Sequence, residues 1–333
     1  MKILRNLQVP TGNICIMEGD KGKLEFLSIG DYGKNANIKA DFLGITRELE
    51  GVPNGKIEPL ENKWVITLST QYGCNSKCKF CDVPKVGKGL NATFNDLKNQ
   101  LEQALLLHPQ INHTDRLNVH FARMGEPSWN PEVIEFTKKI YETTKPHIGG
   151  SLIHPVFTTM FPKNNKLLIP LLLQWCELKN NMFDGNAGLQ FSINSTDDKQ
   201  RDEMFGKSSL SLQEISDIGK LLPSPKGRKY AINIALADEY IINPERLKEL
   251  FPIDRFMVKI TPLHKTISCE ENNIKTTKGY AEYTPYRPTE EALKNVGYDV
   301  LVFIPSYDED MGRITCGNVI LSGSIPETTF KEI

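Results

Sequence analysis

The sequence predicts an α/β protein built as a partial (β/α)6 barrel, with a short N-terminal β-rich cap and a C-terminal extension. Short runs rich in β-branched and aromatic residues alternate with segments of helical period along most of the 333 residues. This alternation implies right-handed crossovers and a parallel sheet. Because six such units are too few for an eight-stranded barrel, the sheet is expected to close only in part.

The expected strands follow one another through the chain. Six runs are interpreted as buried parallel strands, at residues 64–70, 117–123, 154–159, 188–194, 230–236 and 256–261. A seventh run, at 299–305, follows a helix-like segment at 289–297 and is expected to extend the sheet at one edge. The first 63 residues hold two candidate strands, NICIM and KLEFLSI, around a glycine-containing turn. The predicted units are therefore a cap at 1–63, the partial barrel at 64–265 and the extension at 266–333.

The helices between the strands carry recognisable start signals. Two are capping-box patterns and two are an asparagine followed by a proline: Thr93 with Asp96, Ser211 with Glu214, Asn130 with Pro131, and Asn243 with Pro244. These signals place helix starts after the expected strands.

Composition excludes several classes of protein. The formal net charge of −1 gives no global attraction to nucleic acid. No apolar run approaches the roughly 20 residues needed to cross a bilayer, and MKILRNLQVPTG has too short an apolar stretch for a signal peptide. The seven cysteines are not spaced as a disulfide framework. We therefore expect a cytoplasmic protein with reduced thiols and no membrane partner; the sequence does not indicate its oligomeric state.

Three cysteines, Cys74, Cys78 and Cys81, follow the first barrel strand, at the edge of the sheet where active sites of such barrels lie. Three thiolates on one loop can bind three irons of a 4Fe–4S cluster and leave the fourth iron open. Zinc is the alternative, with Asp82 or a distant histidine as fourth ligand, but the second CxxC pair typical of zinc sites is missing. Three unligated thiols are the remaining interpretation. The spacing favours the cluster.

The C-x3-C-x2-C spacing, with the aromatic Phe80 before the last cysteine, resembles the signature of radical S-adenosylmethionine (SAM) enzymes. The resemblance implies a radical-SAM barrel and SAM as a second cofactor, chelated by the open iron. In that family the reduced cluster cleaves SAM to a 5′-deoxyadenosyl radical that abstracts hydrogen from an unactivated position. It also implies a reductant such as flavodoxin or ferredoxin.

Residues for binding SAM are implied by the same resemblance. The stretch RMGEP (123–127) is similar to the family's GEP element, so Gly125, Glu126 and Pro127 would form the turn across the methionyl amino group, with Glu126 as acceptor. Gly125 permits a close approach of the backbone. The alternative is an ordinary turn at a strand end with a surface glutamate.

Polar residues also end the fourth and sixth strands. Ser192 and Asn194 lie where the family contacts the sugar and carboxylate of SAM, although such residues are also common helix caps. His264 lies where the subgroup described next usually has an asparagine that contacts the cofactor; as an isolated histidine it would be structural.

A narrower resemblance, to the RlmN/Cfr group of radical-SAM RNA methyltransferases, spans residues 64–322. Its motifs occur in order: STQYGCNSKCKFCD, MGEPSWN, SINSTDDKQRDEMF, KITPLH and GRITCGNVIL. In that group the cysteine matched by Cys316 is methylated by one SAM, and a second SAM generates a carbon radical that attacks C2 or C8 of an adenine. Direct transfer cannot methylate such an electrophilic amidine carbon. The alternative for Cys316 is a small buried apolar residue.

The sequence departs from the group at two places. Thr67 stands where the group has a second cysteine that resolves the covalent adduct, and residues 1–63 are too short and strand-like for its helical RNA-binding domain. Three hypotheses follow: a methyl synthase acting on a nucleobase through Cys316, with RNA adenine implied by resemblance; a radical-SAM enzyme on another substrate with Cys316 as hydrogen-atom donor; and a non-catalytic iron–sulfur or zinc module.

Two groups of basic residues are candidates for contacting substrate phosphates at the barrel mouth. One surrounds the cysteine loop and the other precedes the fifth strand: Lys77, Lys79, Lys85 and Lys88, and Lys226, Arg228 and Lys229. The alternative for the loop lysines is charge balance for an anionic cluster. The basic residues do not decide between these two interpretations; it is the resemblance to the RNA methyltransferases that implies RNA or another nucleotide-containing molecule as a partner.

Overall fold

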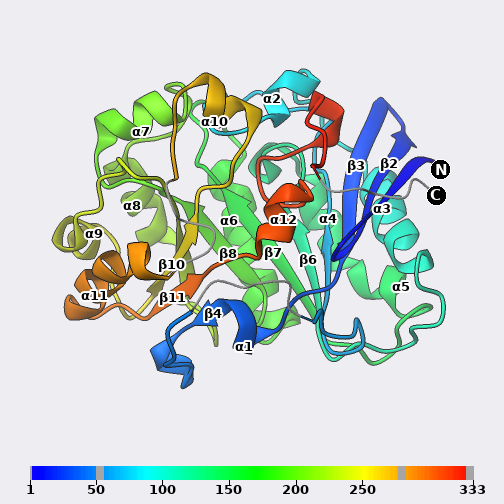
Figure 1. The fold of residues 1–333 in the computed structure, drawn as a ribbon, viewed down its shortest axis with the longest axis horizontal. Helices are drawn as coiled ribbons and strands as arrows, with labels where there is room; N and C mark the ends of the chain where they lie inside the picture. Colours follow the sequence, from blue (N-terminus) through cyan, green and yellow to red (C-terminus); the bar gives the residue numbers. More distant parts are fainter. Residues whose placement is uncertain (1, 50–55, 277–282, 328–333) are drawn as a thin grey trace.

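The computed structural model describes residues 2–49, 56–276 and 283–327. Its strands form one sheet in the order β1-β2-β3-β5-β6-β7-β8-β9-β10-β11-β4, with helices packed around it (Figure 1). The strands are β1 (Ile3–Val9), β2 (Gly12–Gly19), β3 (Gly22–Ile29), β4 (Ile38–Lys39), β5 (Trp64–Thr67), β6 (Leu117–Phe121), β7 (Ile153–Thr159), β8 (Gly188–Ser192), β9 (Tyr230–Leu236), β10 (Phe256–Pro262) and β11 (Val300–Phe303).

The strands from β5 to β11 pair in parallel with their neighbours, so the predicted α/β class and large parallel sheet are confirmed. The seventh run forms β11, which pairs with β10 (Val258 opposite Val300). It is not the edge, because the short β4 pairs antiparallel on its outer side. Closure of this sheet into a partial barrel stays a prediction.

The N-terminal segment joins the same sheet at both ends. β1, β2 and β3 form an antiparallel meander, and β3 pairs antiparallel with β5 (Leu27 opposite Thr67). The two expected strands around a glycine-containing turn are therefore present, and β1 is a further strand that the sequence did not indicate. β4, from the same segment, lies beyond β11. The division at residues 63 and 265 stays a prediction.

The helices are α1 (Lys34–Asn37), α2 (Val83–Val86), α3 (Phe94–Leu106), α4 (Glu132–Lys138), α5 (Ile140–Thr144), α6 (Leu168–Glu177), α7 (Asp198–Met204), α8 (Leu212–Leu221), α9 (Pro244–Leu250), α10 (Ile267–Glu271), α11 (Arg287–Asn295) and α12 (Tyr307–Met311). Both predicted capping boxes are formed, at α3 and α8, and Asn243 caps α9. α4 instead begins after Pro131, because the Asn130 amide donates to Thr70 O and Ala92 O, at 2.8 Å each. None of the helices in the described ranges is long and apolar enough to span a bilayer.

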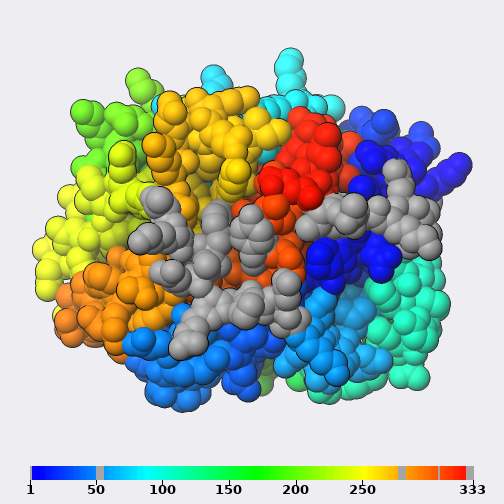
Figure 2. All heavy atoms as spheres, viewed as in Figure 1, coloured from blue at the N-terminus to red at the C-terminus, as the bar shows by residue number. Residues whose placement is uncertain are grey.

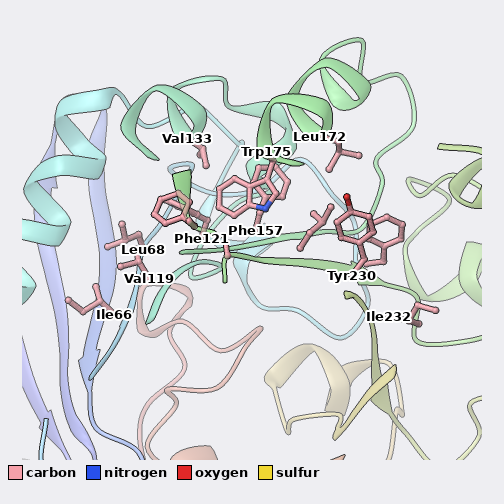
Figure 3. Close-up of a cluster of buried hydrophobic side chains, with 14 of the residues drawn as sticks. Ile66, Leu68, Val119, Phe121, Val133, Phe157, Leu172, Trp175, Tyr230 and Ile232 are labelled. Carbon is pink, nitrogen blue, oxygen red and sulfur yellow. The ribbon is translucent and has the colours of Figure 1, made fainter. Parts of the chain in front are cut away.

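One face of the parallel sheet carries the apolar core. Phe121 of β6 and Phe157 of β7 meet Trp175 of α6, with ring centroids 6.0 and 5.1 Å away. Figure 3 shows these rings beside Val133 of α4 and Leu172 of α6. Since successive side chains on a strand point to opposite faces, the residues between these rings must point the other way.

That opposite face, here called the inner face, is polar and partly open to solvent. His120, Gln190, Asn233 and Lys259 lie on it, one each from β6, β8, β9 and β10, and each is partly exposed. Thr158 of β7 donates to Gln190 Oε1 at 3.2 Å across it. Parallel sheets are usually buried by apolar contacts on both faces. This polar, partly exposed face is therefore a candidate surface for binding a ligand.

Candidate functional site

The cysteine triplet lies on the loop from β5 to α2, at the carboxyl-terminal edge of the sheet. Cys74, Cys78 and Cys81 are all partly exposed free thiols. Burial raises the pKa of Cys78 well above its usual value, and the Cys81 and Cys74 thiols raise it further, so the three sulfurs are neighbours. Within the described ranges, no three Cys, His, Asp or Glu side chains converge on one point that would hold a single metal ion.

The loop is held in place by Asp82, the residue after the last cysteine. Its buried carboxylate accepts from the Ser268 backbone N–H at 2.8 Å and from the Ser268 hydroxyl at 2.7 Å, and also from Ile267 N at 3.2 Å. The Ser268 hydroxyl also lies 3.0 Å from Cys81 O. Asp82 therefore connects the loop to α10, and its carboxylate accepts three hydrogen bonds there.

The structure brings Cys316 to this loop from the far end of the chain. The backbone N–H of Asp82 donates to Gly317 O at 2.9 Å. Gly317 has φ 89°, and a Cβ there would lie 3.3 Å from Phe80 O, so glycine suits both the backbone conformation and the close packing. Cys316 has a solvent-exposed surface. The protein atoms packed around it nevertheless raise the pKa of its thiol, and the positive charges of Arg123 and Lys259 oppose that rise. Its electrostatic influence on Cys78 and Cys81 places it beside the triplet.

A buried ion pair fixes the segment that carries Cys316. Arg123, the residue before MGEP, donates from Nε to Glu25 Oε1 at 2.9 Å and from Nη2 to Arg313 O at 2.9 Å. Glu25, on β3, also accepts from Ile320 N at 3.2 Å and Leu321 N at 3.0 Å. The pair therefore holds the chain on both sides of Cys316. Figure 2 shows this C-terminal segment between the N-terminal strands and the segment that includes α10.

Sequence reasoning missed this pair. The available signal was Glu25, a charged residue in the otherwise apolar run KLEFLSI, which must be paired if that strand is buried.

Glu126 is buried, and its carboxylate is held by backbone groups. Oε1 accepts from Ser128 N at 3.1 Å and Oε2 from Met160 N at 3.0 Å; burial nevertheless raises its pKa. Gly125 has φ 92°, and a Cβ there would lie 2.5 Å from Gln71 Cβ, so the close approach at this glycine is to the loop after β5. Pro127 opens a short 3-10 turn. The surface-glutamate alternative is wrong, because Glu126 is 5% exposed; cofactor binding by this element stays a prediction.

Ser192 and Asn194 differ in their surroundings. Ser192 ends β8 and is partly exposed. Asn194 is buried with φ 59°, and its Oδ1 accepts from Ala235 N at 2.9 Å, so its side chain links the ends of β8 and β9. Helix α7 is capped by Asp197, so neither Ser192 nor Asn194 is its helix cap. The predicted contacts of Ser192 and Asn194 with SAM stay predictions.

His264 follows β10 and lies close to the Cys316 segment. Its Nδ1 is 3.6 Å from Asp310 Oδ1. Burial, together with the positive charge of Lys259, lowers its pKa to about 3, so the imidazole is neutral at physiological pH. A neutral ring can both donate and accept a hydrogen bond. Its predicted contact with the cofactor stays a prediction.

Comparisons with known proteins point to one group. The search of family models finds no match. An RNA methyltransferase RlmN of Buchnera aphidicola is 30% identical over 136 residues, which cover 39% of this chain and 38% of that protein. A probable RlmN of Carboxydothermus hydrogenoformans is 26% identical over 260 residues, covering 76% and 68%. The chain resembles the RlmN group of radical-SAM methyltransferases.

The fold agrees with this resemblance. The crystal structure of a radical SAM methyltransferase from Sphaerobacter thermophilus matches with a TM-score of 0.60 over 93% of this chain and 77% of that one, at 16% identity. The predicted RlmN/Cfr-like resemblance is therefore confirmed. The match to the first relative spans about two fifths of that protein's length, so the relatives' activity and substrates come to this chain only as proposals.

Proposed function

We propose that the chain is a radical-SAM enzyme that methylates an unactivated carbon of a nucleobase through Cys316, with an RNA adenine as the substrate suggested by its RlmN relatives. The observation that carries the proposal is the hydrogen bond from Asp82 N to Gly317 O, because it joins the cysteine triplet to the segment of Cys316. A reductant such as flavodoxin or ferredoxin and a cytoplasmic location belong to the same proposal.

The residues present fit a 4Fe–4S cluster. In the protein alone, burial and neighbouring thiols raise the pKa values of Cys78 and Cys81, so three thiolates there require compensating positive charge. Iron supplies that charge, and thiolates are its preferred ligands. Cys74, Cys78 and Cys81 would hold the cluster, which when bound supplies the electron that cleaves SAM reductively.

The remaining assignments concern binding and the methyl carrier. Glu126, with Gly125 and Pro127, would bind the methionyl amino group of SAM, and Ser192, Asn194 and His264 would contact the rest of it. Cys316 must lose its thiol proton to accept a methyl group, because the thiolate is the nucleophile. Arg123 and Lys259 favour that ionisation, as their positive charges lower the pKa that burial raises.

A second function is favoured by one observation. Thr67 lies on β5 in place of the group's second cysteine, and a hydroxyl cannot resolve an adduct by disulfide chemistry. Cys316 would then act as a hydrogen-atom donor to a substrate radical on a different molecule. The third hypothesis is a non-catalytic iron–sulfur or zinc module. A polar, partly exposed inner face does not favour it, because such a face suits the binding of a ligand.

The first test is reductive cleavage of SAM by anaerobically reconstituted protein. We expect 5′-deoxyadenosine from the wild type and its loss in Cys74→Ala, Cys78→Ala and Cys81→Ala, since each substitution removes one iron ligand. Cys15→Ala, in the buried interior of β2, is the matched control and should retain both the cluster absorbance and cleavage. Wild-type cleavage by all three loop variants would refute the assignment.

A further inference from the structure

Four exposed lysines lie on or beside the cysteine loop. Lys77 and Lys79 flank Cys78, Lys88 follows α2, and Lys207 follows α7. In the part of the chain that the structure describes, none of their ammonium groups makes a hydrogen bond or an ion pair. Figure 1 shows α2 and α7 along the same edge of the molecule. The contacts between the segments that carry these lysines show that they form one surface.

The turn after α7 packs against the middle of the loop. Lys79 N donates to Met204 O at 2.8 Å. Gly206 lies so close to Lys77 that a Cβ on this glycine would be 2.6 Å from Lys77 Cβ and 2.6 Å from Lys77 O. Lys207 is the next residue, so its Cα lies about 3.8 Å from that of Gly206. Lys207 is therefore a neighbour of the two loop lysines.

The segment after α2 is joined to the start of the same loop. Cys74 N donates to Gly87 O at 3.1 Å, and Gly89 N donates to Asn75 Oδ1 at 3.1 Å. The residues on both sides of Lys88 are therefore hydrogen-bonded to the loop. The four lysines of this surface are here called the lysine patch: Lys77, Lys79, Lys88 and Lys207.

The carboxylates near the lysine patch are mostly paired with other lysines. Glu271 pairs with Lys85 at 2.7 Å, and Asp202 pairs with Lys163 at 3.2 Å. Glu203, on α7, is exposed and has no ion pair among the described residues. The surface therefore keeps an excess of positive charge, which suits an acidic partner.

The lysine patch lies directly over the residues expected to hold the cluster. Cys78 packs against Met204 and Phe205 of a small buried group, whereas its neighbours Lys77 and Lys79 are exposed. Since consecutive Cα atoms are about 3.8 Å apart, a molecule lying on these lysines approaches the cysteines across one layer of backbone. A partner at this surface is therefore placed to deliver an electron to a cluster bound by the loop.

Two features favour a protein partner over RNA. Cys316, which the substrate base must reach, is joined to the end of the loop, because Gly317 O accepts from Asp82 N at 2.9 Å, whereas Lys88 is joined to its start. Leu90 is 52% exposed, and its N–H donates to Lys88 O at 2.9 Å. The patch thus combines charge with an apolar side chain, as protein interfaces do.

We propose that the lysine patch is the docking surface for the protein that reduces the cluster, a small acidic carrier of single electrons. This assignment rests on the proposed function, because it requires a cluster on the three loop cysteines. The carrier loses one electron, which passes to the cluster; no bond forms and no proton moves. Interfaces of electron-transfer partners are among the smallest between proteins, which suits a patch of a few exposed side chains.

The test is the affinity of anaerobically reconstituted protein for two acidic carriers, a flavodoxin and a ferredoxin, measured by calorimetry. Two double variants remove charge: Lys88→Gln with Lys207→Gln, and Lys77→Gln with Lys79→Gln. At low ionic strength we expect each to weaken binding of at least one carrier about tenfold, because complementary charges steer association. The difference should shrink at high salt, which screens exposed charges.

The matched control removes the same charge elsewhere. Lys145→Gln with Lys248→Gln changes two exposed lysines, after α5 and on α9, that have no ion pair with any described residue, and it should bind as the wild type. Formation of 5′-deoxyadenosine gives a second measurement. With reduced carrier as the electron source it should fall in the two patch variants, and with dithionite, a small-molecule reductant, it should equal that of the wild type.

Wild-type affinity in both patch variants, or no binding of either carrier to the wild type, overturns the proposal. A loss of affinity for a short adenine-containing RNA with carrier binding retained also overturns it, and assigns the lysine patch to the substrate. If carrier binding depends on the patch but dithionite yields no 5′-deoxyadenosine in the wild type, the docking surface stands and the proposed function fails.

Discussion

At the scale of single residues, the site depends on contacts between segments far apart in the sequence. Glu25 is a residue of the N-terminal strands, Arg123 follows β6, and the carbonyls and N–H groups they hold flank Cys316. A buried ion pair is weak evidence for net stability, but losing one partner leaves an uncompensated charge. We therefore interpret the pair as a positioning device for Cys316.

Glu25→Gln should show this role. The substitution leaves Arg123 buried without a counter-charge, and we expect a loss of about 3–5 kcal/mol in the free energy of unfolding. In a Cys78→Ala background, where Cys316 is expected to be unmethylated, alkylation of Cys316 by iodoacetamide under native conditions should also become faster, because its segment loosens. Unfolding in urea and mass spectrometry of the alkylated peptide measure the two effects.

Glu135→Gln is the matched control, since Glu135 pairs with Lys138 at the surface, where such pairs contribute little. Wild-type stability together with an unchanged alkylation rate in Glu25→Gln would show that the pair does not hold the Cys316 segment.

At the scale of elements, α12 connects β11 to the Cys316 segment. Ser306 and Glu309 form its capping box, and Asp310 accepts from the Thr315 hydroxyl at 3.1 Å, one residue before Cys316. Burial raises the pKa of Glu309 to about 7 and that of Asp310 to about 6. At pH values between the unfolded and the folded pKa values, the carboxyl groups of Glu309 and Asp310 are therefore protonated in the native protein but not in the unfolded chain.

This predicts a pH dependence of stability. For Glu309 the folded pKa exceeds the unfolded value of 4.5, so its contribution is present at low pH and is lost as pH rises from about 4.5 through 7. In Glu309→Gln the amide oxygen can still accept from the Ser306 N–H. Between pH 5 and pH 8 the free energy of unfolding of this variant should fall less than that of the wild type, and the difference should be at most about 3 kcal/mol.

Urea unfolding at the two pH values measures the difference. Glu291→Gln, on the exposed side of α11, should behave as the wild type. If Glu309→Gln and the wild type have the same pH dependence, Glu309 is not protonated on folding as inferred.

At the scale of the whole molecule, local patterns predicted the parallel strands and most helix starts. Hydrophobic periodicity and capping residues are local signals, and they located β5 to β11 and the capping boxes of α3 and α8. The cysteine triplet lies on the loop between β5 and α2, as its position after the first barrel strand predicted. What the sequence could not predict depends on pairing over long distances: β1, β4 beyond β11, and the Glu25–Arg123 pair.

The positions of some charged residues in the fold could also not be predicted from the sequence. Arg228 was expected at the mouth beside the catalytic edge, but it precedes β9 and therefore lies at the opposite edge. Lys259 was part of an apolar strand pattern, and in the structure it lies on the partly exposed inner face. Whether a strand residue faces a core or a hollow depends on the shape of the sheet, which periodicity does not determine.

The central claim is that Cys316 carries a methyl group, and the mass of the Cys316 peptide tests it most directly. In wild-type protein purified from cells, we expect a stable gain of one methyl group on Cys316. The same peptide from Cys78→Ala protein should be unmodified, because methylation needs SAM bound at the cluster, and Cys316→Ala should still cleave SAM but form no product. An unmodified Cys316 in active protein, or product formation by Cys316→Ala at the wild-type rate, would contradict the account.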